Sequence, residues 1–192
     1  MHAKRASLRM LAVAAGAAMA LGLSGSMANA DQNSDDALLA PGSHVPMSMA
    51  TDQMIKECDS IPSEHDPEVN KIVYDVAMER GVDERVLLST FETAWVESHM
   101  NNLDCGDRDS LGVFQQRPSQ GWGTPEQVQD PVYATNAYLD QAIPNAANNP
   151  GWTPGEVAQS VQRSAYPDRY DEAEGKAREL IAEAEAAAAG QQ

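Results

Sequence analysis

The chain has 192 residues, a length that suits a single domain. Its 13 Lys and Arg stand against 29 Asp and Glu, which gives a formal net charge of −16 at pH 7. This balance argues strongly against a nucleic-acid-binding protein, because neutralising phosphates requires clustered Lys and Arg, and it does not favour an anionic membrane surface.

Residues 1–30 are predicted to be a secretory signal peptide. Three basic residues are followed by a short apolar run, 10–23, and by the small-x-small pattern Ala-Asn-Ala that precedes a cleavage site. The apolar run is too short for a usual membrane span of about 20 residues. The sequence therefore predicts a mature protein that is extracellular or associated with the cell wall after cleavage near Ala30, with no membrane span. Its net charge would be −19, because cleavage removes three basic and no acidic residues.

Residues 31–64 are predicted to be a flexible linker and lead-in, because they mix polar residues, Gly and Pro and show no hydrophobic periodicity. Cys58 lies in this segment and Cys105 lies in a later polar loop. Outside the cell an even pair of Cys usually forms a disulfide, although two free thiols are the alternative. Closing such a loop contributes roughly 4 kcal/mol by the chain-entropy estimate. The sequence implies no metal and no cofactor, since two distant Cys without a local His do not make a zinc site.

Residues 65–170 are predicted to form the main domain, and they carry repeated helix signals. Pro or an acidic residue follows each capping residue, and Gly81 suits the stop of the first helix. The predicted starts are Asp66, Asp83, Thr124, Asp130 and Thr153.

The fold class predicted from these signals is mainly α. Normal-length strands rich in alternating Val or Ile are not found, although a short hairpin fits within residues 110–116. Residues 171–192 are rich in Ala and Glu and are predicted to form a helical tail. We expect this tail to be a solvated extension, because Ala is too small for a firm seam between helices.

Glu97 lies in the last turn of the second predicted helix, ahead of a polar stretch that ends in a run rich in Gly, Gln and aromatic residues. The helix macrodipole is negative at this end, so the pKa of Glu97 should rise, and partial burial would raise it further. A raised pKa is what a general acid needs near neutral pH. The helix position alone leaves open a Glu that simply faces solvent.

An ordered set of motifs follows Glu97. Glu97-Ser98 is followed by Asn101 or Asn102, by Ser110-Leu-Gly-Val-Phe-Gln115, and by Asp130-Pro131 ahead of Tyr138-Leu139. This order resembles lytic transglycosylases of the lysozyme-like superfamily, which carry Glu-Ser, an Asn, and Ser-x-x-Gly-Leu-x-Gln in a loop at the sugar cleft. The runs "GDRDSLGVFQQRPSQGWGTPEQ" and "VQRSAYP" are similar to secreted actinobacterial proteins of this type. The resemblance covers residues 85–170.

The resemblance implies a lysozyme-like helical domain with a short hairpin or loop at the cleft. It implies peptidoglycan glycan strands as the substrate and cleavage between N-acetylmuramic acid and N-acetylglucosamine. Glu97 would first protonate the glycosidic oxygen. It would then act as the base that lets the muramyl 6-hydroxyl close a 1,6-anhydro ring.

Polar and aromatic side chains near Glu97 are candidate sugar contacts, because amides can hydrogen-bond acetamido groups and aromatic faces pack on sugar C–H groups. Tyr166 comes from "VQRSAYPDRY", which stands where the family has Ala-Tyr-Asn-Ala-Gly, so it is the candidate for the family's Tyr. Phe114 is another candidate for an aromatic face, although packing in the core explains it equally well. The predicted substrate-binding residues are Ser98, Gln115, Gln116, Trp122 and Tyr166.

Other activities stay open at this point. A muramidase would need a second carboxylate, at about 5–5.5 Å for retention or 6.5–9.5 Å for inversion, and Asp104, Asp107 and Asp109 are candidates. Asp in such a loop more often makes turns and caps. The chain could also be a non-catalytic lysozyme-like module that binds wall glycan, or a structural secreted protein that keeps only the fold.

Overall fold

The structure is a computed structural model that describes residues 56–190. The predicted signal peptide, 1–30, and most of the predicted linker, 31–55, lie outside the described residues. Within the described part, no helix has the length and apolar character needed to cross a membrane.

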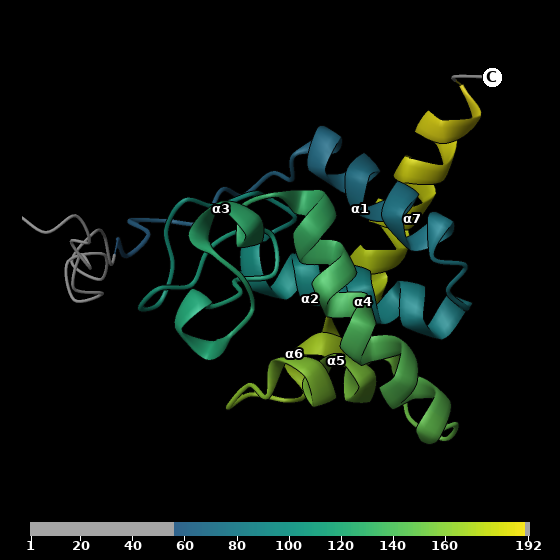
Figure 1. The fold of residues 1–192 in the computed structure, drawn as a ribbon. Coiled ribbons are helices and arrows are strands. Elements are labelled where there is room, and N and C mark those ends of the chain that lie inside the picture. Colours follow the sequence, from purple (N-terminus) through teal and green to yellow (C-terminus); the bar gives the residue numbers. More distant parts are fainter. Residues whose placement is uncertain (1–55, 191–192) are drawn as a thin grey trace, which may run out of the picture. The chain divides into compact units, whose positions relative to one another are not determined.

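The described residues are mainly helical, which confirms the predicted fold class (Figure 1). The predicted hairpin is reduced to an isolated antiparallel bridge between Leu111 and Gln116. The elements in chain order are α1 (Pro67–Glu79), α2 (Glu84–Ser98), the 3-10 helix η1 (Pro118–Gln120), α3 (Pro125–Val128), α4 (Pro131–Asn148), α5 (Pro154–Gln162), α6 (Arg169–Glu172) and α7 (Glu174–Ala189).

Five helices begin where the sequence signals place them, because their caps are local hydrogen bonds. The side chain of Asp83, for example, accepts a hydrogen bond of 2.8 Å from the backbone N–H of Val86. Thr124 and Thr153 each complete a capping box with the side chain three residues further on. These caps fix the starts of α1 to α5.

Helix α2 is the centre of the core, where it contacts α1, α4, α5, α6 and α7 (Figure 1). Phe91 and Ala94 of this helix are fully buried, as is Tyr138 of α4. The Tyr138 hydroxyl lies 2.6 Å from the Ser89 hydroxyl, so its polar end is satisfied inside the core. The last turn of α2, which carries Glu97, is therefore held on a rigid scaffold.

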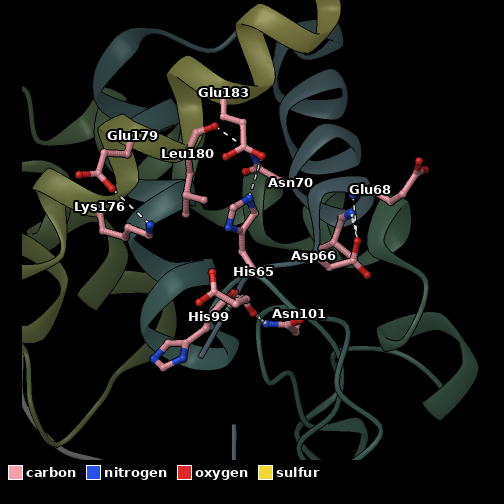
Figure 2. Close-up of polar contacts among 12 residues, drawn as sticks. His65, Asp66, Glu68, Asn70, His99, Asn101, Lys176, Glu179, Leu180 and Glu183 are labelled. Atoms are coloured by element: carbon pink, nitrogen blue, oxygen red, sulfur yellow. Dashed lines mark hydrogen bonds and ion pairs between the residues drawn. The ribbon is translucent and has the colours of Figure 1, made fainter. Parts of the chain in front are cut away.

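Helix α7 packs into the core, which corrects the expectation of a solvated tail. Ala177 and Leu180 are buried. Asn70 of α1 donates a hydrogen bond of 3.0 Å to the Leu180 carbonyl oxygen, and His65 lies 2.9 Å from Glu183 (Figure 2). The small side chain of Ala allows close approach of α7 to α1 and α2. Because Ala occupies both buried and exposed positions of this helix, the sequence pattern does not show which face is buried.

The disulfide between Cys58 and Cys105 is present, as predicted, with Cα atoms 5.0 Å apart. The Gly106 N–H donates a hydrogen bond of 2.9 Å to the Lys56 carbonyl oxygen beside this bridge. The chain that leads into α1 is thus joined to the loop that follows α2.

Residues 56–64 are held against the domain at further points, so this end of the predicted linker is not a free segment. Asn101 donates a hydrogen bond of 2.9 Å to the Glu64 carbonyl oxygen. His99 Nδ1 lies 2.7 Å from the Pro62 carbonyl oxygen, and its ring stacks on Trp95. These contacts depend on tertiary proximity, which the composition of the segment did not reveal.

Candidate active site

A cavity of about 430 Å³ lies at the end of α2. Its walls come from α2, from residues 115–122, and from the end of α5 together with the segment that leads into α6. Three predicted site residues meet there, namely Glu97, Gln115 and Trp122.

Glu97 is half-buried in this cavity, and its Oε1 accepts a hydrogen bond of 2.8 Å from the Tyr170 hydroxyl. Burial raises the pKa of Glu97, while Tyr170, the Gln162 amide and the charge of Arg169 act in the opposite direction without cancelling it. The direction of the shift agrees with the sequence prediction. The main cause of the raised pKa is desolvation of the Glu97 carboxyl, not the helix macrodipole.

Tyr170 is one of the cavity residues that the sequence did not predict, and the one that contacts Glu97 most directly. It is fully buried, and burial together with the neighbouring Glu97 raises its pKa, so its phenol stays protonated and serves as a donor. The predicted Tyr166 is 68% exposed and does not line the cavity. Both residues belong to one short segment, and the one within α6, Tyr170, points inward.

Gln115 is held in the cavity wall by its own loop. Its Nε2 donates hydrogen bonds of 3.1 Å to the Cys105 carbonyl oxygen and 3.2 Å to that of Gly112. Its backbone has φ of 47°, a left-handed conformation that few non-glycine residues adopt. A Cβ at Gly106 would lie 2.5 Å from the Ser110 carbonyl oxygen and would also overlap the Gln115 side-chain oxygen, so this position requires glycine. The disulfide loop therefore positions Gln115 directly.

Ser98 and Gln116 lie outside the cavity, which corrects the prediction of substrate contact. The buried Ser98 Oγ lies 2.8 Å from the Val113 carbonyl oxygen. The buried Gln116 Nε2 donates a hydrogen bond of 3.0 Å to the Ala134 carbonyl oxygen. These side chains fasten the cavity loop to α2 and α4, because Ser98 Oγ and Gln116 Nε2 bond to backbone groups inside the protein.

The aromatic candidates divide in the same way. Trp122 is half-buried and lines the cavity. Phe114 is fully buried and stacks on Tyr138 with ring centroids 5.0 Å apart. Trp122 thus offers an aromatic surface to a ligand, and Phe114 belongs to the core.

None of the three candidate second carboxylates lines the cavity. Asp104 is exposed and pairs with Lys56 at 3.0 Å. Asp107 is exposed. Asp109 is partly buried, which raises its pKa, but hydrogen bonds from the Ser119 backbone and from Arg117 and Ser119 side chains outweigh this and lower it to about 2. Among the described residues that line the cavity, Glu97 is the sole carboxylic acid.

No protein-family model matches the chain, and no curated protein matches it. The chemistry that points to a function is that of the cavity. The cavity lining includes one carboxyl group, two guanidinium groups, three side-chain amides and two aromatic rings. Within residues 56–190, no three His, Cys, Asp or Glu side chains are grouped to hold a metal ion. The arrangement can transfer a proton from Glu97 and hydrogen-bond a polar ligand.

A second unusual carboxyl, that of Glu92, lies in α2 outside the cavity. Glu92 is fully buried, and neither carboxyl oxygen has a hydrogen-bond partner. Burial, with Asp171 and Glu174 nearby, raises the pKa of Glu92 to about 8, although Arg178 lowers it. No sequence signal marked this residue, because a single Glu within a helix usually faces solvent.

Proposed function

We propose that the protein is a secreted lytic transglycosylase of the lysozyme-like type that cleaves peptidoglycan glycan strands. The observation that carries this proposal is a single carboxyl group, Glu97, with a raised pKa in a cavity that offers no second carboxyl. Trp122 and the cavity amides suit a sugar ligand. The motif order from Glu97 to Gln115 supports the family assignment.

The reaction needs one residue that acts twice. Protonated Glu97 gives its proton to the glycosidic oxygen as the bond between that oxygen and the muramyl C1 breaks. The resulting carboxylate then takes the proton of the muramyl 6-hydroxyl while the 6-oxygen bonds to C1. Glu97 ends protonated, the sugar carries a 1,6-anhydro ring, and no water is consumed.

The pKa of Glu97 suits both halves of this cycle. Burial keeps the acid protonated to a higher pH than an exposed Glu, so it can donate near neutrality. The Tyr170 hydroxyl bonds to Oε1, which stabilises the carboxylate after the first step and orients Oε2 for proton transfer. The cavity therefore tunes one carboxyl for both roles.

The test uses the mature chain, residues 31–192, with its disulfide intact, on isolated peptidoglycan. Mass spectrometry of the released fragments should find 1,6-anhydro ends, and Glu97→Gln should abolish them. Glu92→Gln is the matched control, since it makes the same substitution in the same helix outside the cavity, and it should retain activity.

Two outcomes would contradict this proposal. Fragments with reducing ends, one water heavier, would identify a hydrolase, which must recruit a second carboxylate on binding substrate. Absence of fragments from the unmutated chain, together with its sedimentation with the wall, would identify a non-catalytic glycan-binding module.

A further inference from the structure

The charge of the Glu97 cavity is opposite to that of the whole chain. The chain has a net charge of −16. The charged side chains that line the cavity are Glu97, Arg117 and Arg163. A third guanidinium, that of Arg169, acts on Glu97 from nearby. The cavity is thus a locally basic place on an acidic protein, and it can attract an anionic group.

The two lining arginines differ in how far their charge is already neutralised. Arg117 pairs with Asp109, with 2.8 Å between Nε and Oδ1. Arg163 donates hydrogen bonds to neutral oxygens alone, 3.0 Å to the Val161 carbonyl and 3.3 Å to the Gln141 amide. Among the described residues Arg163 forms no ion pair. Its charge is therefore available to a ligand in the cavity.

The backbone at Arg163 supports a role for this side chain. Arg163 is the C-cap of α5 and has φ of 56°, in the left-handed region. Gly and Asn are the residues that adopt this conformation most readily at helix ends. An arginine in such a position carries a conformational cost, and costs of this kind often mark functional sites.

We propose that the cavity selects glycan strands that carry a carboxylate substituent, and that Arg163 is the residue that binds this carboxylate. The inference rests on the proposed function for the presence of a glycan. A guanidinium binds a carboxylate through paired hydrogen bonds, which a neutral substituent cannot match. Two parts of peptidoglycan supply this chemistry, the muramyl lactyl group once its peptide is removed and the stem peptide itself.

Binding to the Glu97→Gln chain tests the proposal without turnover. Calorimetry would compare three kinds of soluble strand: those with stem peptides, those stripped to free lactyl carboxylates, and those whose carboxylates are converted to neutral methylamides. We expect carboxylate-bearing strands to bind more tightly than the methylamide strands. The tighter of the first two identifies which carboxylate is bound.

The decisive variant is Arg163→Asn, because Asn tolerates the left-handed backbone. It should raise the Kd for carboxylate-bearing strands about tenfold, because one charge-assisted interaction is lost. The Kd for methylamide strands should not change. Arg163→Lys should recover part of the affinity. Arg108→Asn is the matched control, since Arg108 also has a positive φ, 55°, and lies outside the cavity lining.

The proposal is overturned if all three strands bind equally, if none binds, or if Arg163→Asn weakens binding to methylamide strands as much as to the others. An equal effect of Arg108→Asn would overturn it as well. Its failure is separate from failure of the proposed function. A transglycosylase without charge selectivity still releases anhydro fragments, and a non-catalytic module with this selectivity still binds carboxylate strands more tightly.

Discussion

Tyr170 controls the carboxyl on which the proposed chemistry depends. Its hydroxyl donates to Glu97 Oε1 at 2.8 Å and lowers the pKa that burial raises. A hydrogen bond between a neutral donor and a carboxylate favours the charged form. Tyr170 is therefore a positioning residue that orients Glu97 and limits the rise of its pKa, of which burial remains the main cause.

Tyr170→Phe should raise the pKa of Glu97 further, because it removes a donor to the carboxylate. The first step needs protonated Glu97, so activity falls as pH rises through this pKa. The variant should therefore move the basic limb of the pH profile to higher pH. Activity at every pH should nevertheless fall, by about tenfold, because the carboxylate formed in the first step loses one hydrogen bond that stabilises and orients it.

Tyr166→Phe is the control, since Tyr166 is exposed outside the cavity, and its pH profile should match that of the unmutated chain. A thermal melt of each variant separates loss of folding from loss of function. An unmoved basic limb in Tyr170→Phe would show that the hydrogen bond does not set the pKa of Glu97.

Individual residues differed in how well the sequence predicted them. The position of Glu97 in the last turn followed from the motif order and the caps of α2, which are local. The inward placement of Tyr170 did not, because α6 has four residues and its Asp168 cap makes no side-chain hydrogen bond. Ser98 looked like a cleft residue by its neighbour Glu97, but the helix turns its hydroxyl toward the loop.

At the scale of elements, the loop between α2 and α3 connects the disulfide to the cavity. Cys105 is bridged to Cys58, and its carbonyl oxygen accepts a hydrogen bond from Gln115 in the cavity wall. Covalent closure of the loop from Cys58 to Cys105 lowers the conformational entropy of the unfolded chain. It also fixes the Cys105 carbonyl oxygen to which Gln115 bonds. Stability and ligand binding should thus respond together to the bridge.

The double substitution Cys58→Ser with Cys105→Ser should lower the free energy of unfolding by about 2–4 kcal/mol. KM for peptidoglycan should rise more than kcat falls, because the bridge supports Gln115 whereas Glu97 stands on α2. Denaturant unfolding and fragment release measure the two effects.

Asp104→Asn, which removes an exposed ion pair beside the bridge, should change stability by less than about 1 kcal/mol. A loss confined to kcat would contradict this account.

The helices show which elements can be predicted from sequence. The starts of α1 to α5 depend on a cap and one or two neighbours, so a short stretch of sequence contains the whole signal. The docking of α7 depends on α1 and α2, which are far away in sequence. Its buried Ala177 and Ala184 are indistinguishable in the sequence from the exposed Ala residues of the same helix.

At the scale of the whole molecule, Glu92 links stability to pH. It lies in the core helix α2, where burial is the main cause of its raised pKa. Asp171 of α6 and Glu174 of α7 raise the pKa further, and Arg178 of α7 lowers it. The pKa of Glu92 is about 8 in the folded chain, against an ordinary value of 4.5. Between these values the folded state binds more protons than the unfolded state, so the free energy of unfolding falls as pH rises.

Glu92→Gln should therefore stabilise the protein near neutral pH, where the unmutated chain must keep a proton on this carboxyl in order to fold. The gain should be about 2–3 kcal/mol at pH 7 and close to zero at pH 4.5, where about half of the unfolded chains already carry this proton. Urea unfolding at the two pH values measures the difference.

Glu179→Gln, at an exposed position of α7, should show no such dependence on pH. Equal effects of Glu92→Gln at both pH values would mean that its proton is not linked to folding. A loss of stability at pH 7 would mean that the buried carboxylate has partners which the amide cannot replace.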